Sequence, residues 1–183
     1  MPPRKALPAG HGDSRDFWRK VEERFSHRKG QVKVARLLYD LGLRAEGDTV
    51  FCGPVPMSDV AIGRAAGVDR RVVRATLDTL QADDHLRAVF TGLRPVAFLK
   101  EAARGLGLGV LEVFPEDAAR PGVLSEITAA VAEARIPVRQ AFAEDPYLAE
   151  EARLTLITGR PVPARLIERL RRLKSVKRVV VYA

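Results

Sequence analysis

The order of elements in the C-terminal half constrains the fold of this chain most. Hydrophobic residues alternate over 110–114, recur at helical spacing over 121–135, and alternate again over 136–143 and 153–158. A second helical pattern follows, and the chain closes with a β-branched run over 176–182. Two βαβ halves in this order form one antiparallel sheet with both helices on one face. We therefore expect an α+β fold.

The junction before the first of these helices carries Pro121 and Gly122. Proline suits a first helical turn because its missing N–H is not needed there, so we expect the helix to begin at Pro121. The predicted buried stripe of the helix consists of Leu124, Ile127, Val131 and Ala134. A helix start offers unpaired N–H groups to a carboxylate, and a residue without Cβ lets a ligand approach them. The junction therefore predicts a small-molecule site.

Residues 108–183 resemble an ACT domain, a small regulatory module of amino-acid metabolism with a ferredoxin-like βαββαβ fold. The resemblance rests on the order and lengths of the elements together, and on the sequences at 110–113, 121–127, 136–140 and 176–181. ACT domains bind an effector, often an amino acid, at the loop after the first strand and across a dimer interface. The resemblance implies a homodimer and these effector-binding residues: Asp117, Ala119, Pro121, Gly122, Val123, Leu124, Arg139 and Gln140.

The resemblance names no particular effector. Ala119 stands where serine-binding members carry an amide side chain. Asp117 can hold an α-amino group, and Arg139 or Gln140 can take a polar tail. Alternatively, Asp117 caps its own loop, the other two lie on a solvated strand face, and the domain only dimerises.

Two short helices separated by a glycine are predicted over 58–80. Ser58 and Asp69 are favourable N-cap residues, and Gly67 permits a left-handed turn between the helices. Gly63 is small enough for the helices to cross closely. The spacing resembles a helix-turn-helix, whose second helix reads bases in the major groove with its N-terminal residues. The residues predicted to contact DNA are Arg70, Arg71 and Arg74.

A plain helical hairpin is the competing interpretation, because the five Arg residues over 58–91 are offset by five Asp residues. Residues 50–55 and 86–90 are expected to be short strands that form a wing beside the motif, with Cys52 as a small buried hydrophobe. A helix over 31–43 should complete the helical core. The expected organisation is a disordered basic tail over 1–14, a helix-turn-helix domain over 15–92, a linking helix over 93–107 and the ACT domain over 108–183.

The formal net charge of +8 is concentrated toward the proposed DNA-binding side. Residues 1–107 hold 19 Lys and Arg against 13 Asp and Glu, as neutralisation of phosphates requires. The single Cys excludes an internal disulfide framework, and His11, His27 and His85 lack partners at metal-ligand spacing. With no catalytic, cofactor, signal-peptide or membrane-spanning pattern, we expect a cytoplasmic protein that is not an enzyme and holds no metal.

From Trp18 onward the chain resembles a small family of archaeal regulators that pair a helix-turn-helix with an ACT domain. The most specific segments are 67–73, 138–140 and 145–146. The resemblance implies an amino-acid-responsive transcription regulator with DNA, a small effector and a second copy as partners. The alternative is a ligand-sensing protein that docks on an amino-acid biosynthetic enzyme. RNA binding through the basic tail is a weaker reading because no RNA-binding signature supports it.

Overall fold

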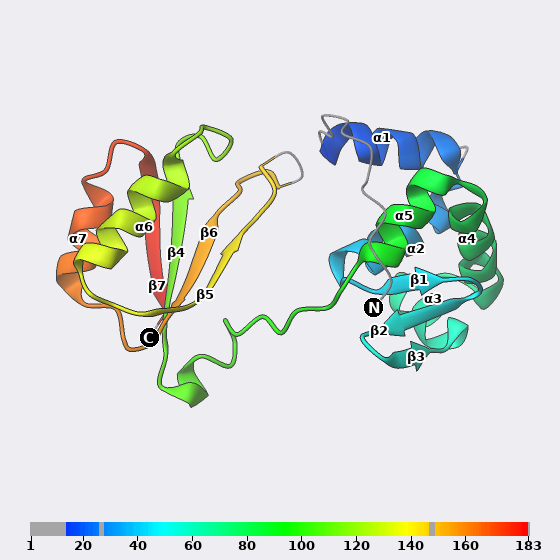
Figure 1. Cartoon of the computed structure of the whole chain (residues 1–183), viewed down its shortest axis with the longest axis horizontal. Coiled ribbons are helices and arrows are strands. Elements are labelled where there is room, and N and C mark those ends of the chain that lie inside the picture. Colours follow the sequence, from blue (N-terminus) through cyan, green and yellow to red (C-terminus); the bar gives the residue numbers. More distant parts are fainter. Residues whose placement is uncertain (1–13, 26–27, 147–148, 183) are drawn as a thin grey trace, which may run out of the picture. The chain divides into compact units, whose positions relative to one another are not determined.

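The chain divides into two compact units, Met1–Ala97 and Phe98–Ala183, here called the N-terminal and C-terminal units (Figure 1). The structure is a computed structural model that describes residues 14–25, 28–146 and 149–182. The expected disordered tail lies outside these residues except for Ser14, and so do His11 and His27. Among the described residues, no helix is both long and apolar enough to cross a membrane.

The N-terminal unit combines helices with a small antiparallel sheet (Figure 1). Its helices are α1 (Ser14–Arg24), α2 (Lys29–Asp40), α3 (Asp59–Ala66), α4 (Arg70–Ala82) and α5 (Asp84–Gly92). Its strands, paired in the order β1-β2-β3, are β1 (Arg44–Glu46), β2 (Thr49–Cys52) and β3 (Val55–Met57). The core gathers one side chain or more from each helix, including Val21, Leu38, Ile62, Leu77 and Phe90.

Two of the expected strands are not arranged as predicted. Residues 86–90 are helical, because the Asp83 carboxylate accepts hydrogen bonds from the N–H groups of His85 and Leu86 and so caps α5. The small sheet instead precedes the helix-turn-helix segment and is built entirely from β1, β2 and β3. Cys52, expected to be buried, is half-buried at the end of β2.

The C-terminal unit is a four-stranded antiparallel sheet with two helices (Figure 1). In chain order its elements are the 3-10 turn η1 (Arg104–Leu106), β4 (Gly109–Pro115), α6 (Val123–Glu133), β5 (Val138–Ala143), β6 (Leu154–Thr158), α7 (Ala164–Arg171) and β7 (Val176–Tyr182). The strands lie in the order β5-β6-β4-β7, which is the order of a ferredoxin-like sheet. The expected α+β class and βαββαβ sequence are confirmed.

Strand β4 is buried on both faces of this sheet. Leu111 and Val113 belong to the cluster that packs against α6 and α7. The side chain of Val110, the residue before Leu111, points to the opposite face of the sheet, where it packs with Ile157 and Ala103. A segment that precedes β4 in the chain therefore covers the face that the helices leave open.

Helix α6 begins two residues later than predicted. Gly122 is its N-cap with a φ of 88°, so the helical turn starts at Val123 and Pro121 lies before it. The buried stripe shifts accordingly, and Leu124 is 46% exposed. The buried residues are Val123, Ile127, Ala130 and Val131.

The prediction of a linking helix over 93–107 is wrong. Residues 93–99 have no helical turn, and the only helical part is the 3-10 turn at Arg104–Leu106. Proline at position 95 supplies no N–H and disfavours the helical conformation at Arg94. The compact units also divide earlier than expected, between Ala97 and Phe98.

Candidate nucleic-acid interface and effector site

The turn between α3 and α4 is capped on both sides. The Ser58 hydroxyl accepts a hydrogen bond from the Ala61 N–H at 3.2 Å and starts α3. Gly67 ends that helix in the left-handed conformation, with a φ of 66°. The Asp69 carboxylate then accepts from the Arg71 N–H at 2.8 Å and starts α4. The three residues expected to shape this turn therefore do so, which is the geometry of a helix-turn-helix.

Gly63 sets how closely the two helices approach. A Cβ placed on this glycine would lie 2.8 Å from the Val68 carbonyl oxygen and 3.4 Å from the Arg70 nitrogen. No side chain fits in that space. The start of α4 is thus held against the middle of α3, and the first turn of α4 is fixed in position.

The three arginines predicted to contact DNA differ in their surroundings. Arg70 and Arg71, in the first turn of α4, are exposed, and neither makes an ion pair with another described residue. Arg74 is also exposed, but its Nε lies 2.5 Å from the Asp59 carboxylate and its Nη1 lies 3.3 Å from the Asp48 carboxylate. The hydrogen bond with Asp59 also raises the pKa of the Arg74 guanidinium. Two of the three arginines are thus available to phosphates or bases, while the third is paired with two carboxylates of the same unit.

The start of α2 lies beside the start of α4. A Cβ on Gly30 would lie 3.1 Å from a methyl group of Val72. The exposed residues Arg28 and Lys29 adjoin Gly30 in the chain, as the exposed Arg70 and Arg71 adjoin Val72, so all four lie near this contact. We call these four residues the basic surface. The sequence left Arg28 and Lys29 open as either phosphate contacts or a solvated basic helix face, because their proximity to α4 depends on tertiary packing.

The expected effector loop is a well-formed turn at the end of β4. The Asp117 carboxylate accepts a hydrogen bond from the Ala119 N–H at 2.9 Å, so it caps its own loop. Pro121 and Gly122 are exposed, and Val123 is buried in the core. Arg120 forms an ion pair with Glu126 at 2.8 Å beside the first turn of α6.

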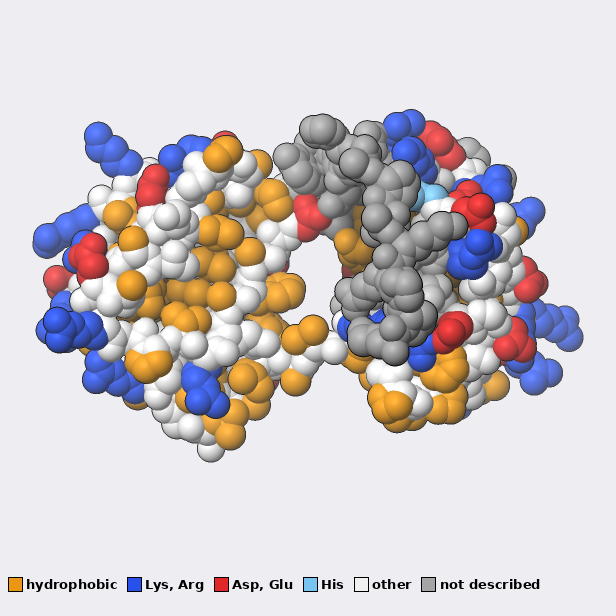
Figure 2. All heavy atoms as spheres, in the orientation of Figure 1, with side chains coloured by type: hydrophobic (Ala, Val, Ile, Leu, Met, Phe, Trp, Pro, Cys, Tyr) orange, Lys and Arg blue, Asp and Glu red, His pale blue; other side chains and the backbone are white. Residues whose placement is uncertain are grey.

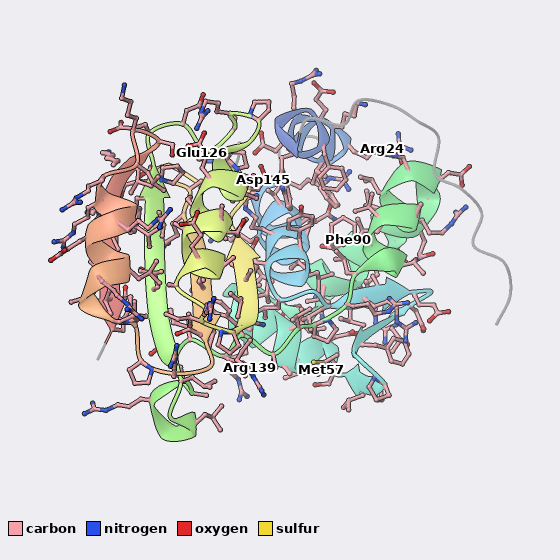
Figure 3. The ribbon with its side chains drawn as sticks, turned by 60° about the vertical axis from the view of Figure 1, so that its left-hand side comes forward. Arg24, Met57, Phe90, Glu126, Arg139 and Asp145 are labelled. Carbon is pink, nitrogen blue, oxygen red and sulfur yellow. The ribbon has the colours of Figure 1, made fainter. Side chains whose placement is uncertain are left out.

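Arg139 and Gln140 lie at the opposite end of the sheet from this loop. Strand β5 begins where Val138 pairs with Thr158, and Thr158 pairs with Gly109 at the start of β4. The loop follows Pro115 at the other end of β4, roughly 20 Å away at ~3.4 Å per strand residue. In Figure 3, Glu126 of α6 and Arg139 of β5 accordingly lie at opposite ends of the unit. One chain does not bring the two halves of the expected effector site together.

Gln140 has a different partner. Its side-chain carbonyl accepts a hydrogen bond from the Leu99 N–H at 3.0 Å. It therefore fixes the segment that leads into the C-terminal unit, an arrangement that the strand pattern alone did not predict.

A buried ionic cluster around Glu112 was missed by the sequence analysis. The Glu112 side chain is 3% exposed; Lys100 donates to it at 2.8 Å and the Tyr182 hydroxyl at 2.6 Å. Arg153 lies 3.6 Å from the same carboxylate. Burial alone would raise the pKa of Glu112, but the hydrogen bonds from Lys100 and Tyr182 outweigh it, so the pKa lies below its ordinary value. The available signal was a single carboxylate inside an otherwise apolar strand.

Within the part of the chain that the structure describes, no three His, Cys, Asp or Glu side chains gather where they could hold a metal ion. His85 is exposed at the start of α5, with its ring 6.1 Å from the ring of Phe17.

No protein-family model matches the chain, and no curated protein sequence matches it. Solved structures that resemble it include an AsnC family transcriptional regulator from Agrobacterium tumefaciens, with 13% identity and a TM-score of 0.29 over 84% of this chain and 87% of that one. Another is the feast or famine regulatory protein from M. tuberculosis complexed with L-methionine, with 19% identity and a TM-score of 0.27 over 85% and 90% of the two chains. A third is a transcriptional regulator from Neisseria meningitidis in complex with L-Met, with 13% identity and a TM-score of 0.28 over 84% and 86%. These solved neighbours are named as regulatory proteins, two of them as transcriptional regulators, and their TM-scores are too low to assign the chain to a family.

Proposed function

We propose that the chain is an amino-acid-responsive transcription regulator that binds DNA through α4. The observation that carries the proposal is the pair Arg70 and Arg71, exposed and without ion pairs to described residues, at the capped start of the second helix of a helix-turn-helix. In that motif the first residues of the second helix reach base edges. Arginine can pair with guanine through two hydrogen bonds or can bind phosphate.

The basic surface supports the same proposal. Arg28 and Lys29 lie beside the start of α4 and extend the positive charge beyond the helix itself. Phosphate contacts from such residues set the register of a protein on the duplex. Arg74 contributes differently, because its ion pairs with Asp59 and Asp48 stabilise the orientation of α4 relative to α3 and to the β1–β2 turn.

The C-terminal unit is proposed to bind the effector and to form a homodimer. Val138 is 43% exposed and Phe142 49% exposed on β5, which is an edge strand of the sheet. Figure 2 shows hydrophobic side chains gathered on this unit. Edge strands with unpaired backbone groups favour pairing with a second copy. In such a dimer, the loop at Asp117 of one copy and Arg139 of the other could meet, as the ACT resemblance implies.

The DNA-binding part can be tested by retention of fragmented genomic DNA on the purified protein at moderate salt, followed by sequencing. The Arg70→Ala/Arg71→Ala variant is expected to lose the enriched sites. Arg171→Ala/Arg172→Ala is the matched control, because it removes the same charge from exposed positions at the end of α7 in the other unit. It should retain the enriched sites.

Equal retention by the two double variants would contradict the role of α4. If no sequence is enriched by the unaltered protein, DNA recognition itself is wrong. Co-purification with a biosynthetic enzyme would then favour the enzyme-docking alternative.

A further inference from the structure

Residues 98–108, here called the strap, cross the open face of the C-terminal sheet before the chain enters β4. The ring of Phe98 lies 5.1 Å from the ring of Phe142 on β5. The Leu99 N–H donates to Gln140 on the same strand at 3.0 Å. Lys100 then reaches Glu112 on β4 at 2.8 Å and the Tyr182 hydroxyl on β7 at 3.3 Å. The strap is therefore attached to three of the four strands.

The second half of the strap closes over the beginning of β4. Ala103 is fully buried against Val110 and Ile157. The chain then turns through η1 and re-enters the sheet, with Leu108 packed against the same small cluster. A short apolar layer thus lies between the strap and the sheet.

A cavity of about 440 Å³ opens beside this layer. Its apolar wall includes Leu108, Val110, Pro161, Val162 and Val181. Its polar members, Lys100, Glu101, Arg104 and Tyr182, come from the strap and from the end of β7. An apolar wall with a few polar groups, in this size range, is the usual composition of a small-molecule site.

The charged residues of the cavity fall into two kinds. Lys100 is committed to Glu112 and to Tyr182. Glu101 and Arg104 are exposed, and neither makes an ion pair with any described residue. One unpaired carboxylate and one unpaired guanidinium therefore stand three residues apart at an apolar cavity. Together they are complementary to a ligand that carries both an ammonium and a carboxylate beside an apolar group.

We infer that this cavity binds an α-amino acid with an apolar side chain. Arg104 takes its carboxylate through charge-assisted hydrogen bonds, Glu101 takes its ammonium, and the side chain lies against Leu108 and Val110 on the face that the strap covers. The inference rests on the proposed function, since it gives the effector a location, under the strap, that differs from the loop at Asp117. It also gives binding a route to a response, because the strap directly follows Ala97, the last residue of the N-terminal unit.

The test is isothermal titration calorimetry on the full chain, without DNA, using L-leucine, L-valine and L-phenylalanine separately. Two analogues of leucine dissect the site: 4-methylpentanoate lacks the ammonium, and 3-methylbutylamine lacks the carboxylate. The variants are Glu101→Gln and Arg104→Gln, both at exposed positions whose side chains make no ion pair with a described residue. Arg171→Gln is the matched control, and Leu124→Arg obstructs the exposed start of α6 beside the Asp117 loop.

At least one of the three amino acids is expected to bind, and each of the two strap variants should weaken its binding about tenfold or more. Arg104→Gln should leave the weaker binding of 3-methylbutylamine unchanged, and Glu101→Gln should leave that of 4-methylpentanoate unchanged. The control and Leu124→Arg should bind like the unaltered chain.

Loss of binding in Leu124→Arg with retention in both strap variants would overturn the inference in favour of the Asp117 loop. No binding of any of the three amino acids would also overturn it. DNA retention measured on the same preparation separates the two failures. Sites that are still enriched without amino-acid binding leave the proposed DNA recognition standing, whereas strap-dependent amino-acid binding without enriched sites supports the inference and contradicts only the DNA-binding role.

Discussion

Gly63 and Val68 lie so close that a Cβ on the glycine would come within 2.8 Å of the valine carbonyl oxygen. The contact is between backbones, so no side-chain rotation can relieve it. This single approach fixes the crossing of α3 and α4, and with it the orientation of the first turn of α4.

Gly63→Ala is therefore expected to destabilise the N-terminal unit by about 1–3 kcal/mol, because the clash exceeds the gain in helix propensity. Urea unfolding gives the free energy difference. Gly92→Ala is the matched control, since Gly92 is also helical but a Cβ there would meet nothing within 4 Å. If alanine left the free energy of unfolding unchanged at both positions, the close approach of Gly63 to Val68 would be contradicted.

The salt dependence of DNA binding distinguishes Arg70 and Arg71 from Arg74. Each of the first two, if it contacts a phosphate, should lower the slope of log K against log salt by roughly one when replaced by alanine. Arg74→Ala should leave that slope closer to its original value while lowering the stability of the unit, because Arg74 is paired with Asp59 and Asp48. Fluorescence anisotropy with an enriched DNA site, over a range of salt concentrations, gives the three slopes. Equal slope changes for all three would show that Arg74 contacts phosphate as well.

Lys100→Met is expected to destabilise the C-terminal unit by about 1–3 kcal/mol, because it leaves the buried Glu112 carboxylate without its nearest cation. Lys177→Met removes the same group from an ion pair with Glu151 in which both side chains are well exposed. That control should change the stability by no more than about 1 kcal/mol. Chemical denaturation followed by circular dichroism measures both, and a similar effect of the two variants would argue against a structural role for the Glu112 cluster.

The same cluster predicts a direction for the effect of acid. Because the pKa of Glu112 in the folded chain lies below its ordinary value of 4.5, the charged carboxylate stabilises the fold above that pH. The contribution is lost as the pH falls below 4.5 and through the folded pKa. Replacing Glu112 with Gln removes this contribution, so the stability gap between the two proteins should narrow on acidification. Urea unfolding at about pH 6 and at a series of lower pH values checks this; a gap that stays constant would contradict the prediction.

Gly122→Val should destabilise the C-terminal unit by about 1–3 kcal/mol even though a Cβ at this position meets nothing within 4 Å. The reason is backbone strain, since the φ of 88° is unfavourable for a β-branched residue. Gly105→Val, at a glycine without positive φ and equally open, is the control and should have a smaller effect. Thermal unfolding of the two variants measures both changes in stability. A loss of ligand binding in Gly122→Val would include the effect of this backbone strain.

Features that depend on neighbouring residues were predictable from the sequence. Ser58, Gly67 and Asp69 cap or end helices because their own side chains or conformations act within a few residues. The strand and helix order of the C-terminal unit followed from hydrophobic periodicity, and β7 (Val176–Tyr182) has the predicted bounds.

The wrong predictions of secondary structure have local causes, in which single residues override the hydrophobic pattern of a segment. The apolar residues at 86–90 suit a strand, but the Asp83 cap starts a helix there. The helical spacing after residue 93 is interrupted by a proline, and α6 begins after the left-handed Gly122 and not at Pro121. In each case one residue with a special backbone or capping role decided the outcome.

The composition of the candidate sites could be predicted only where one element supplies all the residues. Arg70 and Arg71 are neighbours on α4, so the sequence alone showed that they belong to the same site. The contacts of Lys100 with Glu112 and of Leu99 with Gln140 join positions whose pairing depends on how the strap folds back on the sheet. No hydrophobic periodicity in the sequence indicates that the strap folds back on the sheet.

The strap has a consequence for assembly. It occupies the part of the sheet face around Val110 and Ile157, so a second copy that stacked its own sheet there would have to displace it. The strap of the same chain and the sheet of a second copy then compete for one surface. Because only the second contact is intermolecular, a higher protein concentration favours it over the strap. Pairing along the edge strand β5 would instead use the backbone of that strand and not the sheet face around Val110 and Ile157.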